Sequence, residues 1–294
     1  MKQVAGITFM QQVKTIRDIN LRDKHILIRV DFNVPMDEDC DISDDTRIRE
    51  ALPTINYCID NEPKSIVLVS HLGRPKGVQP ELSLKHIIKR LERLLETSVL
   101  FADSIQAVQD LQATAPKGSI ILLENIRFYK EEEKNDETLS KKLAALCDVF
   151  VNDAFGTSHR AHASTYGIAE FVGQKVAGLL LKKEIDSFAK ALANPLKPVL
   201  LIVGGSKVSS KLELLSNILD VVDKIIIGGA MSNTFLASLG FDMAKSLVET
   251  ELIDEARNIL QKAAQKGVKI YLPVDVVSTD DIATHANIKI TPAQ

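Results

Sequence analysis

The sequence predicts an α/β protein of two lobes, each a parallel sheet flanked by helices in a Rossmann-like arrangement. Short runs rich in β-branched residues alternate with longer amphipathic segments, and this alternation is typical of βαβ units. The chain has 294 residues, enough for two ordinary domains, and its 45% hydrophobic and 26% charged residues are usual for a soluble globular protein.

The β-rich runs and the amphipathic segments are expected to form separate elements. The helical segments are clearest at 84–95, where Leu84, Ile87 and Leu91 share one face, and at 251–266, with Gly267 as the C-cap. The runs expected to be strands are 26–30, 65–69, 119–123, 148–151, 199–203, 224–227 and 269–272.

A domain boundary is predicted where a helical segment runs into N-P-L-K-P at 194–198, because proline and asparagine end helices. We therefore expect an N-terminal lobe at 1–180, an interdomain helix and hinge at 181–198, and a partial C-terminal lobe at 199–294.

The charge and the cysteines indicate a cytoplasmic protein. The formal net charge of −3 does not suggest a nucleic-acid or membrane-surface protein. Cys40, Cys58 and Cys147 are odd in number and form no C-x-x-C pair, so neither disulfides nor a zinc site is expected. The N-terminus lacks a sustained apolar run, and the stretch 176–181 is too short to cross a bilayer.

Polar and basic residues directly follow several predicted strands. The carboxyl ends of parallel strands meet at one edge, so we expect these residues to line one crevice that suits a small, highly anionic ligand. For any single arginine the alternative is a weak surface ion pair, but the repetition at successive strand ends favours the crevice. His159 and His162 lack further ligands, so no metal site is predicted. The residues at these ends are Asp31, Asn33, His71, Arg74, Arg127, His159, Arg160 and His162.

The stretch V-G-G-S-K-V-S-S-K at 203–211 is a second candidate for anion binding, although it is neither a P-loop nor a G-x-G fingerprint. Gly204 and Gly205 are expected to close a strand and Ser206 to cap a helix. Lys207 and Lys211 then lie one turn apart at its start, where the helix dipole favours an anion. The buried face of that helix is expected at Val208, Leu212, Leu215 and Leu219. The G-G pair at 228–229 repeats the arrangement, and spacing alone leaves open that both pairs are simply tight turns.

Taken in order, these motifs closely resemble the phosphoglycerate kinase family from about residue 20 to residue 277. The absence of G-x-G argues against a nicotinamide dehydrogenase. The motifs are R-V-D-F-N-V-P, T-R-I-R-E-A-L-P-T-I, V-S-H-L-G-R-P, L-L-E-N-I-R-F, F-V-N-D-A-F-G-T-S-H-R-A-H-A-S, G-G-S-K-V-S-S-K and I-G-G-A-M-S-N-T-F-L.

The resemblance implies a two-lobed, usually monomeric glycolytic kinase that moves a phosphoryl group reversibly between 1,3-bisphosphoglycerate and ADP, giving 3-phosphoglycerate and ATP. It implies ATP/ADP with Mg²⁺, and a catalytic role for Arg47, Lys207 and Lys211. By the same resemblance, 3-phosphoglycerate is bound by Asp31, Phe32, Asn33, Arg47, His71, Gly73, Arg74, Arg127 and Arg160. The nucleotide is bound by Gly205, Lys207, Lys211, Gly228 and Gly229.

The chain departs from the family pattern in two places. After L-P-V-D-V-V at 272–277 the family continues with a W-N-G-P-type loop, an acidic residue that binds adenosine, and a G-G-G-D-T helix start whose aspartate holds Mg-ADP. The nucleotide is therefore expected to supply most of the ligands of Mg²⁺ in this chain. Activity of residues 1–294 alone stays open, the alternative being an inactive homologue that only binds the anion. Ala230 stands where many relatives have glycine, which is expected to be harmless unless that position needs a positive φ.

The second lobe is expected to hold only about three parallel strands, one with an uncovered apolar face, so it is predicted to be marginally stable. Hydrogen exchange on chain 1–294 is expected to show much stronger protection at the Leu122 amide than at the Ile202 amide. Equal protection of the two amides would contradict this prediction.

Overall fold

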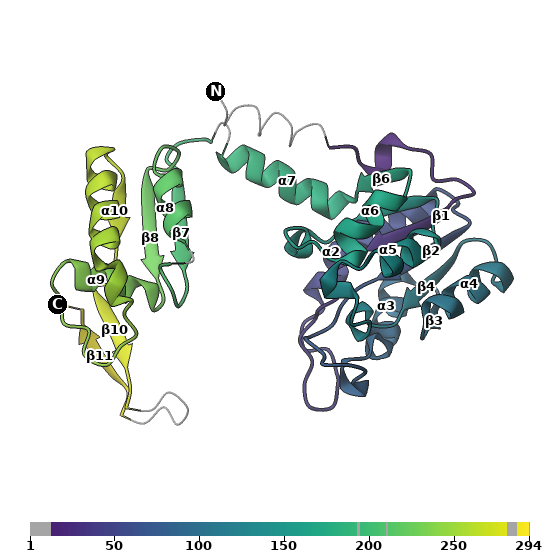
Figure 1. Ribbon diagram of the computed structural model, residues 1–294, viewed down its shortest axis with the longest axis horizontal. Coiled ribbons are helices and arrows are strands. Elements are labelled where there is room, and N and C mark those ends of the chain that lie inside the picture. Colours follow the sequence, from purple (N-terminus) through teal and green to yellow (C-terminus); the bar gives the residue numbers. More distant parts are fainter. Residues whose placement is uncertain (1–12, 193–194, 210, 281–286, 294) are drawn as a thin grey trace. The chain divides into compact units, whose positions relative to one another are not determined.

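The structure is a computed structural model that describes residues 13–192, 195–209, 211–280 and 287–293. The chain divides into two compact units, Met1–Ala189 and Lys190–Gln294, with the boundary inside helix α7 (Leu179–Leu192). Each unit contains its own parallel sheet (Figure 1), so the predicted α/β class is confirmed.

Unit 1, Met1–Ala189, is built on a six-stranded parallel sheet in the order β3-β4-β2-β1-β5-β6. The strands β2 to β4 lie on one side of β1, and β5 and β6 lie on its other side. The order in which the chain adds strands therefore changes side at β1, which pairs with β2 and with β5. Ligands of open parallel sheets bind at such a switch point, outside the carboxyl ends of the strands. The strands are β1 (His25–Arg29), β2 (Ser65–Val69), β3 (Val99–Ala102), β4 (Ser119–Leu123), β5 (Val149–Asn152) and β6 (Gln174–Ala177).

Helices cover both faces of this sheet, because alternate residues of each strand point to opposite sides. In β1, Ile26 and Ile28 belong to one buried cluster and Leu27 to the other. The first cluster includes residues of α2 (Thr46–Asp60) and α3 (Ile88–Leu95). The second includes residues of α4 (Ile105–Thr114), α5 (Glu137–Ala144) and α6 (Ile168–Phe171). The sheet is thus a rigid central layer that fixes where its strand ends lie.

Strands β3 and β6 were not predicted from the sequence. Both strands lie at the edges of the sheet. Strand β6 begins with the exposed residues Gln174 and Lys175, so it lacks the continuous apolar run that predicts a strand. The segment predicted as one helix at 84–95 begins as a 3₁₀ turn, Leu84–Ile87, before α3 continues it.

Unit 2, Lys190–Gln294, has a three-stranded parallel sheet in the order β7-β8-β9. Val203, Ile225 and Ile227 are buried on one face, whereas Ile202 on the other face is 70% exposed. Its elements are β7 (Leu200–Gly204), α8 (Leu212–Ile218), β8 (Lys224–Gly228), α9 (Met231–Ser238), α10 (Ile253–Gln265), β9 (Lys269–Tyr271), and the antiparallel pair β10 (Asp275–Ser278) and β11 (Lys289–Pro292). Helices therefore cover one face of this small sheet within the described residues.

The two Gly-Gly turns of unit 2 approach each other closely at the ends of β7 and β8. Gly229 has φ +69°, and a Cβ there would lie 2.8 Å from the carbonyl oxygen of Gly205. That carbonyl accepts a hydrogen bond from the Met231 amide at 2.9 Å. Ala230 has φ −63°, so this position carries none of the backbone strain that a positive φ would bring.

Three further observations bear on the sequence predictions. Cys40, Cys58 and Cys147 are all free thiols. Across the described ranges, no helix combines the length and apolar character needed to span a membrane. Within the acidic run at 131–137, Glu132 is fully buried.

The close approach of the two turns predicts that Gly229→Ala destabilises unit 2. A methyl group there meets backbone atoms of Gly205 and forces a positive φ on alanine, so urea unfolding is expected to show a loss of about 1–3 kcal/mol. The neighbouring Gly228→Ala is the matched control, since an added Cβ there meets nothing within 4 Å. Equal stability of the two variants would contradict the prediction.

Candidate active site

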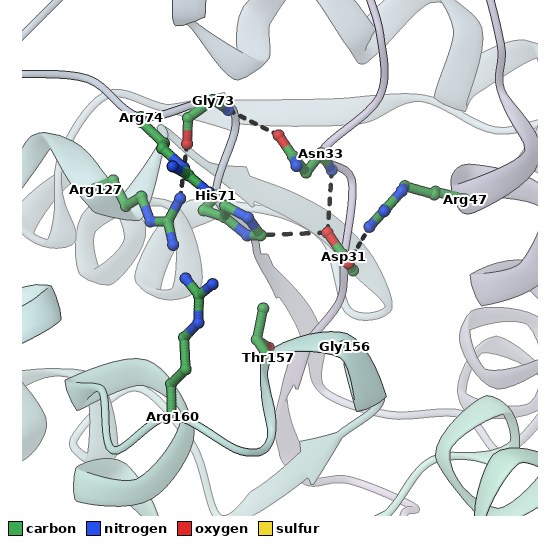
Figure 2. Close-up of a pocket in the computed structure, with 10 residues that line it drawn as sticks. All are labelled: Asp31, Asn33, Arg47, His71, Gly73, Arg74, Arg127, Gly156, Thr157 and Arg160. Carbon is green, nitrogen blue, oxygen red and sulfur yellow. Dashed lines mark hydrogen bonds and ion pairs between the residues drawn. The ribbon is translucent and has the colours of Figure 1, made fainter. Parts of the chain in front are cut away.

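A cavity of about 280 Å³ opens at the carboxyl ends of β1, β2, β4 and β5 in unit 1 (Figure 2). Each of these strands contributes residues through the loop that follows it, and α2 adds one more side chain from its first turn. The lining residues are Asp31, Asn33, Arg47, His71, Gly73, Arg74, Arg127, Gly156, Thr157 and Arg160. Six of the eight strand-end residues expected to share one crevice therefore line this single pocket.

Of the residues that the resemblance assigns to 3-phosphoglycerate binding, only Phe32 does not line this pocket. Its side chain is fully buried, and its backbone amide donates to Ser70 Oγ at 2.8 Å. Gly156 and Thr157 line the pocket but were not predicted. They belong to the loop between β5 and Arg160, so their place in the same motif was the signal available in the sequence.

Hydrogen bonds between side chains and backbone groups connect the loops that form the pocket. Asn33 Oδ1 accepts from the Gly73 amide at 2.8 Å, and the Gly73 carbonyl accepts from Arg127 Nη1 at 2.7 Å. Gly73 has φ +62°, a conformation that glycine adopts at little cost. The loops after β1, β2 and β4 therefore hold one another in register.

Asn125 is a structural residue of the site that the sequence analysis missed. Its side chain is fully buried and donates to the carbonyls of Leu72 and Leu82 at 2.8 and 2.9 Å. Its Oδ1 accepts from the amides of Leu72 and Arg127 at 3.2 and 3.1 Å. This asparagine thus joins the loop that carries His71 to the loop that carries Arg127, although it does not line the pocket.

The pocket is strongly positive. Arg47 pairs with Asp31, and Arg127 Nε lies 3.2 Å from Glu133 Oε1. Figure 2 shows the guanidinium of Arg160 directed toward that of Arg127. Burial lowers the pKa of Arg127, and Arg160 lowers it further, whereas Glu133 opposes both effects. A bound anion would relieve this repulsion, as expected of a site for phosphate or carboxylate.

His71 is a neutral side chain in this positive pocket. Burial, followed by the charges of Arg29, Arg127, Arg47 and Arg160, lowers its pKa to about 2. Its 3.9 Å approach to Asp31 Oδ1 is therefore not an ion pair near neutral pH. His71 can offer the ligand a hydrogen bond but no charge.

The second candidate site differs from the sequence prediction. Ser206 does not cap a helix, because α8 begins only at Leu212, with Lys211 in the N-cap position and no side-chain cap. Lys207 thus lies in the loop before the helix and is not one helical turn from Lys211. Of the expected buried face, Val208, Leu215 and Leu219 are buried, but Val208 precedes the helix. The helix therefore starts later than the sequence pattern predicts.

The glycine turn after β8 borders a larger cavity, which the glycines after β7 do not line. Gly229 is among the residues that line a cavity of about 750 Å³, together with Asn233, Pro273 and Val277; Lys207 and Lys211 are not among them. Glu249 accepts hydrogen bonds from the loop that carries Lys207, which we call the lysine loop. It accepts from the Val208 amide, from the Ser209 amide at 3.1 Å and from Ser209 Oγ at 2.7 Å. The structure therefore brings Gly205 and Gly229 together, whereas Lys207 and Lys211 do not line the cavity beside Gly229.

No group of three or more metal-ligating side chains that could hold an ion is found in the described part of the chain.

Comparisons with known proteins agree on one family. The sequence profile of the phosphoglycerate kinase family matches residues 16–294. A phosphoglycerate kinase of Helicobacter hepaticus is 73% identical over 98% of this chain and 72% of its own length. One of Wolinella succinogenes is 72% identical over 99% of this chain and 73% of its own. The solved structure of phosphoglycerate kinase from Coxiella burnetii, 41% identical, aligns with a TM-score of 0.78 over 96% of this chain and 71% of its own.

The neutral state of His71 predicts a pH-dependent stability. The histidine pKa is about 2 in the folded protein against 6.5 ordinarily, so below pH 6.5 the unfolded chain binds a proton that the folded chain does not. Stability contributed by this group is present above pH 6.5 and falls by up to ~1.4 kcal/mol per pH unit below it. His71→Gln is expected to flatten the dependence of the unfolding free energy between pH 6.5 and 5. Equal slopes in wild type and H71Q would contradict the prediction.

Proposed function

This chain belongs to the phosphoglycerate kinase family, and we propose that the pocket of unit 1 binds 3-phosphoglycerate while the glycine turns and lysines of unit 2 contact the phosphates of ADP or ATP. The family is one of phosphotransferases. Its reaction transfers a phosphoryl group reversibly between 1,3-bisphosphoglycerate and ADP, giving 3-phosphoglycerate and ATP in glycolysis.

The observation that carries the proposal is the convergence of Arg74, Arg127 and Arg160 with the neutral donor His71 in one cavity. Planar guanidinium groups bind phosphate and carboxylate through paired hydrogen bonds, and 3-phosphoglycerate carries both groups. Asp31 and Asn33 supply acceptors on the opposite side, as Figure 2 shows, and these suit a hydroxyl group rather than an anion.

The chemistry needs charge neutralisation more than proton transfer. The carboxylate of 3-phosphoglycerate is already ionised near pH 7, so no general base has to activate it. Phosphoryl transfer then depends on positioning and on stabilising charge in a loose transition state. We assign this role to Arg47, which is half-exposed and held at the pocket by its ion pair with Asp31, and to Lys207 and Lys211.

The remaining assignments are also proposals. We propose that unit 1 is the 3-phosphoglycerate lobe and unit 2 the nucleotide lobe, that Mg²⁺ arrives with the nucleotide, and that the protein acts as a cytoplasmic monomer. The free state of Cys40, Cys58 and Cys147 supports a reducing compartment. The closely approaching turns at Gly205 and Gly229 support a backbone site for phosphate oxygens.

Calorimetric titration tests the substrate assignment. 3-Phosphoglycerate is expected to bind more tightly than either glycerate or inorganic phosphate, because each of these lacks one half of the contacts. Arg160→Met should weaken binding of 3-phosphoglycerate by roughly tenfold or more, because it removes a charged hydrogen-bond donor. Arg93→Met, at an exposed arginine of α3, is the matched control. Equal affinities for the three ligands would contradict the assignment.

A coupled assay of ATP formation tests the role of Arg47. Arg47→Met is expected to slow turnover by roughly a hundredfold or more, as is typical when a donor to the transferred group is lost, with a much smaller change in 3-phosphoglycerate affinity. A loss of affinity that accounts for the whole effect would assign Arg47 to ground-state binding instead. Binding without any turnover in wild type would favour the inactive anion-binding alternative.

A further inference from the structure

Behind the pocket lies a buried arginine that the proposed function does not use. Arg29, the last residue of β1, is 1% exposed and does not line the cavity. Its three donor positions all have partners: Nε donates to Ser164 Oγ at 2.8 Å, Nη1 donates to the Val30 carbonyl, and Nη2 lies 3.4 Å from His71 Nδ1. Burying a charged group so completely is costly unless its donors are satisfied.

The buried carboxylate of Glu132 balances this arginine and gives the network a direction. Glu132 accepts from Ser164 Oγ at 2.6 Å and from the Ser164 amide at 2.9 Å. A serine hydroxyl has one proton, so Ser164 donates it to Glu132 and must accept from Arg29. The guanidinium is thereby fixed between Ser164 on one side and His71 on the other.

The contact with His71 constrains the imidazole because arginine has no acceptor. A guanidinium stays protonated in proteins and only donates, so the ring nitrogen that faces it must carry a lone pair. That nitrogen is Nδ1, and in a neutral imidazole the proton must then be on Nε2. The low pKa of His71, to which Arg29 contributes after burial, agrees with a neutral ring.

Asp31 could in principle select the other tautomer by accepting a hydrogen bond from a protonated Nδ1. Its Oδ1 lies 3.9 Å from Nδ1, beyond hydrogen-bond distance, and it accepts from the Asn33 amide at 3.3 Å. Asp31 Oδ2 is paired with Arg47. The carboxylate is therefore engaged elsewhere, and the nearer group to Nδ1 is the Arg29 donor.

We propose that Arg29 is a positioning residue that holds His71 in the neutral Nε2–H tautomer, so that His71 donates a hydrogen bond to the anionic ligand. This role rests on the proposed binding of 3-phosphoglycerate in the pocket. The positive charge that attracts the ligand then comes from the pocket arginines, and His71 adds a directed donor without adding a further charge to repel them.

Nitrogen-15 NMR of the histidine side chains tests the proposal directly on the ligand-free protein. In wild type, the His71 ring is expected to show a non-protonated Nδ1 and a protonated Nε2, unchanged between pH 5.5 and 8. A protonated Nδ1, or a titration of His71 near pH 6.5, would overturn the proposal. Because no ligand is present, this result is independent of whether 3-phosphoglycerate binds.

Variants then test whether Arg29 causes the tautomer. Arg29→Met is expected to release it, giving mixed tautomers or a raised histidine pKa, and to weaken 3-phosphoglycerate binding by roughly tenfold. If R29M does not fold, R29M combined with E132Q, which also removes the opposing buried charge, replaces it with the same expectation for the His71 signals. Arg22→Met, at an exposed arginine paired with Glu62, is the matched control and should leave both readouts unchanged. An unaltered Nε2–H tautomer in the folded variant would show that Arg29 does not hold it.

Discussion

The convergence of guanidinium groups at the carboxyl ends of parallel strands is the constraint on which the rest of unit 1 depends. Like charges placed together in one cavity repel, so the surrounding structure must hold them without a ligand. The sheet provides this rigidity through two buried faces, and Asn125 and the turn at Gly73 fix the loops that carry the charges. Asp31 and Glu133 each pair with one arginine, Asp31 with Arg47 and Glu133 with Arg127.

A second set of charges lies deeper and has a different purpose. Arg29 and Glu132 are both buried and are joined through Ser164. The network orients its members, because each guanidinium nitrogen of Arg29 has a defined partner. A buried network of this kind is stable only when each of its polar groups has a hydrogen-bond partner.

Much of this site could be predicted from the sequence, because short polar loops after apolar strands must meet at one edge of a parallel sheet. The predicted pocket residues line one cavity, except Phe32, His159 and His162. Phe32 is buried outside this cavity, because adjacent residues of a loop can point in opposite directions. Asn125 and Glu132 could not be predicted, because their importance comes from burial and partners distant in the sequence, such as Leu72 and Ser164.

Unit 2 was predicted less well for a physical reason. Lysines four residues apart are neighbours only if a helix already exists between them, and α8 begins too late for that. Glu249, distant in the sequence, instead binds the amides of the lysine loop. Local spacing carries no information about such a contact, whereas the Gly-Gly turns follow from local backbone requirements alone.

The measurement that tests the central claim most directly is a titration of the protein with 3-phosphoglycerate, followed through the arginine Nε–H signals in nitrogen-15 NMR spectra. The account predicts that the signals of Arg74, Arg127 and Arg160 shift together and report one dissociation constant. Shifts confined to arginines outside the pocket, such as Arg22 or Arg257, would contradict it.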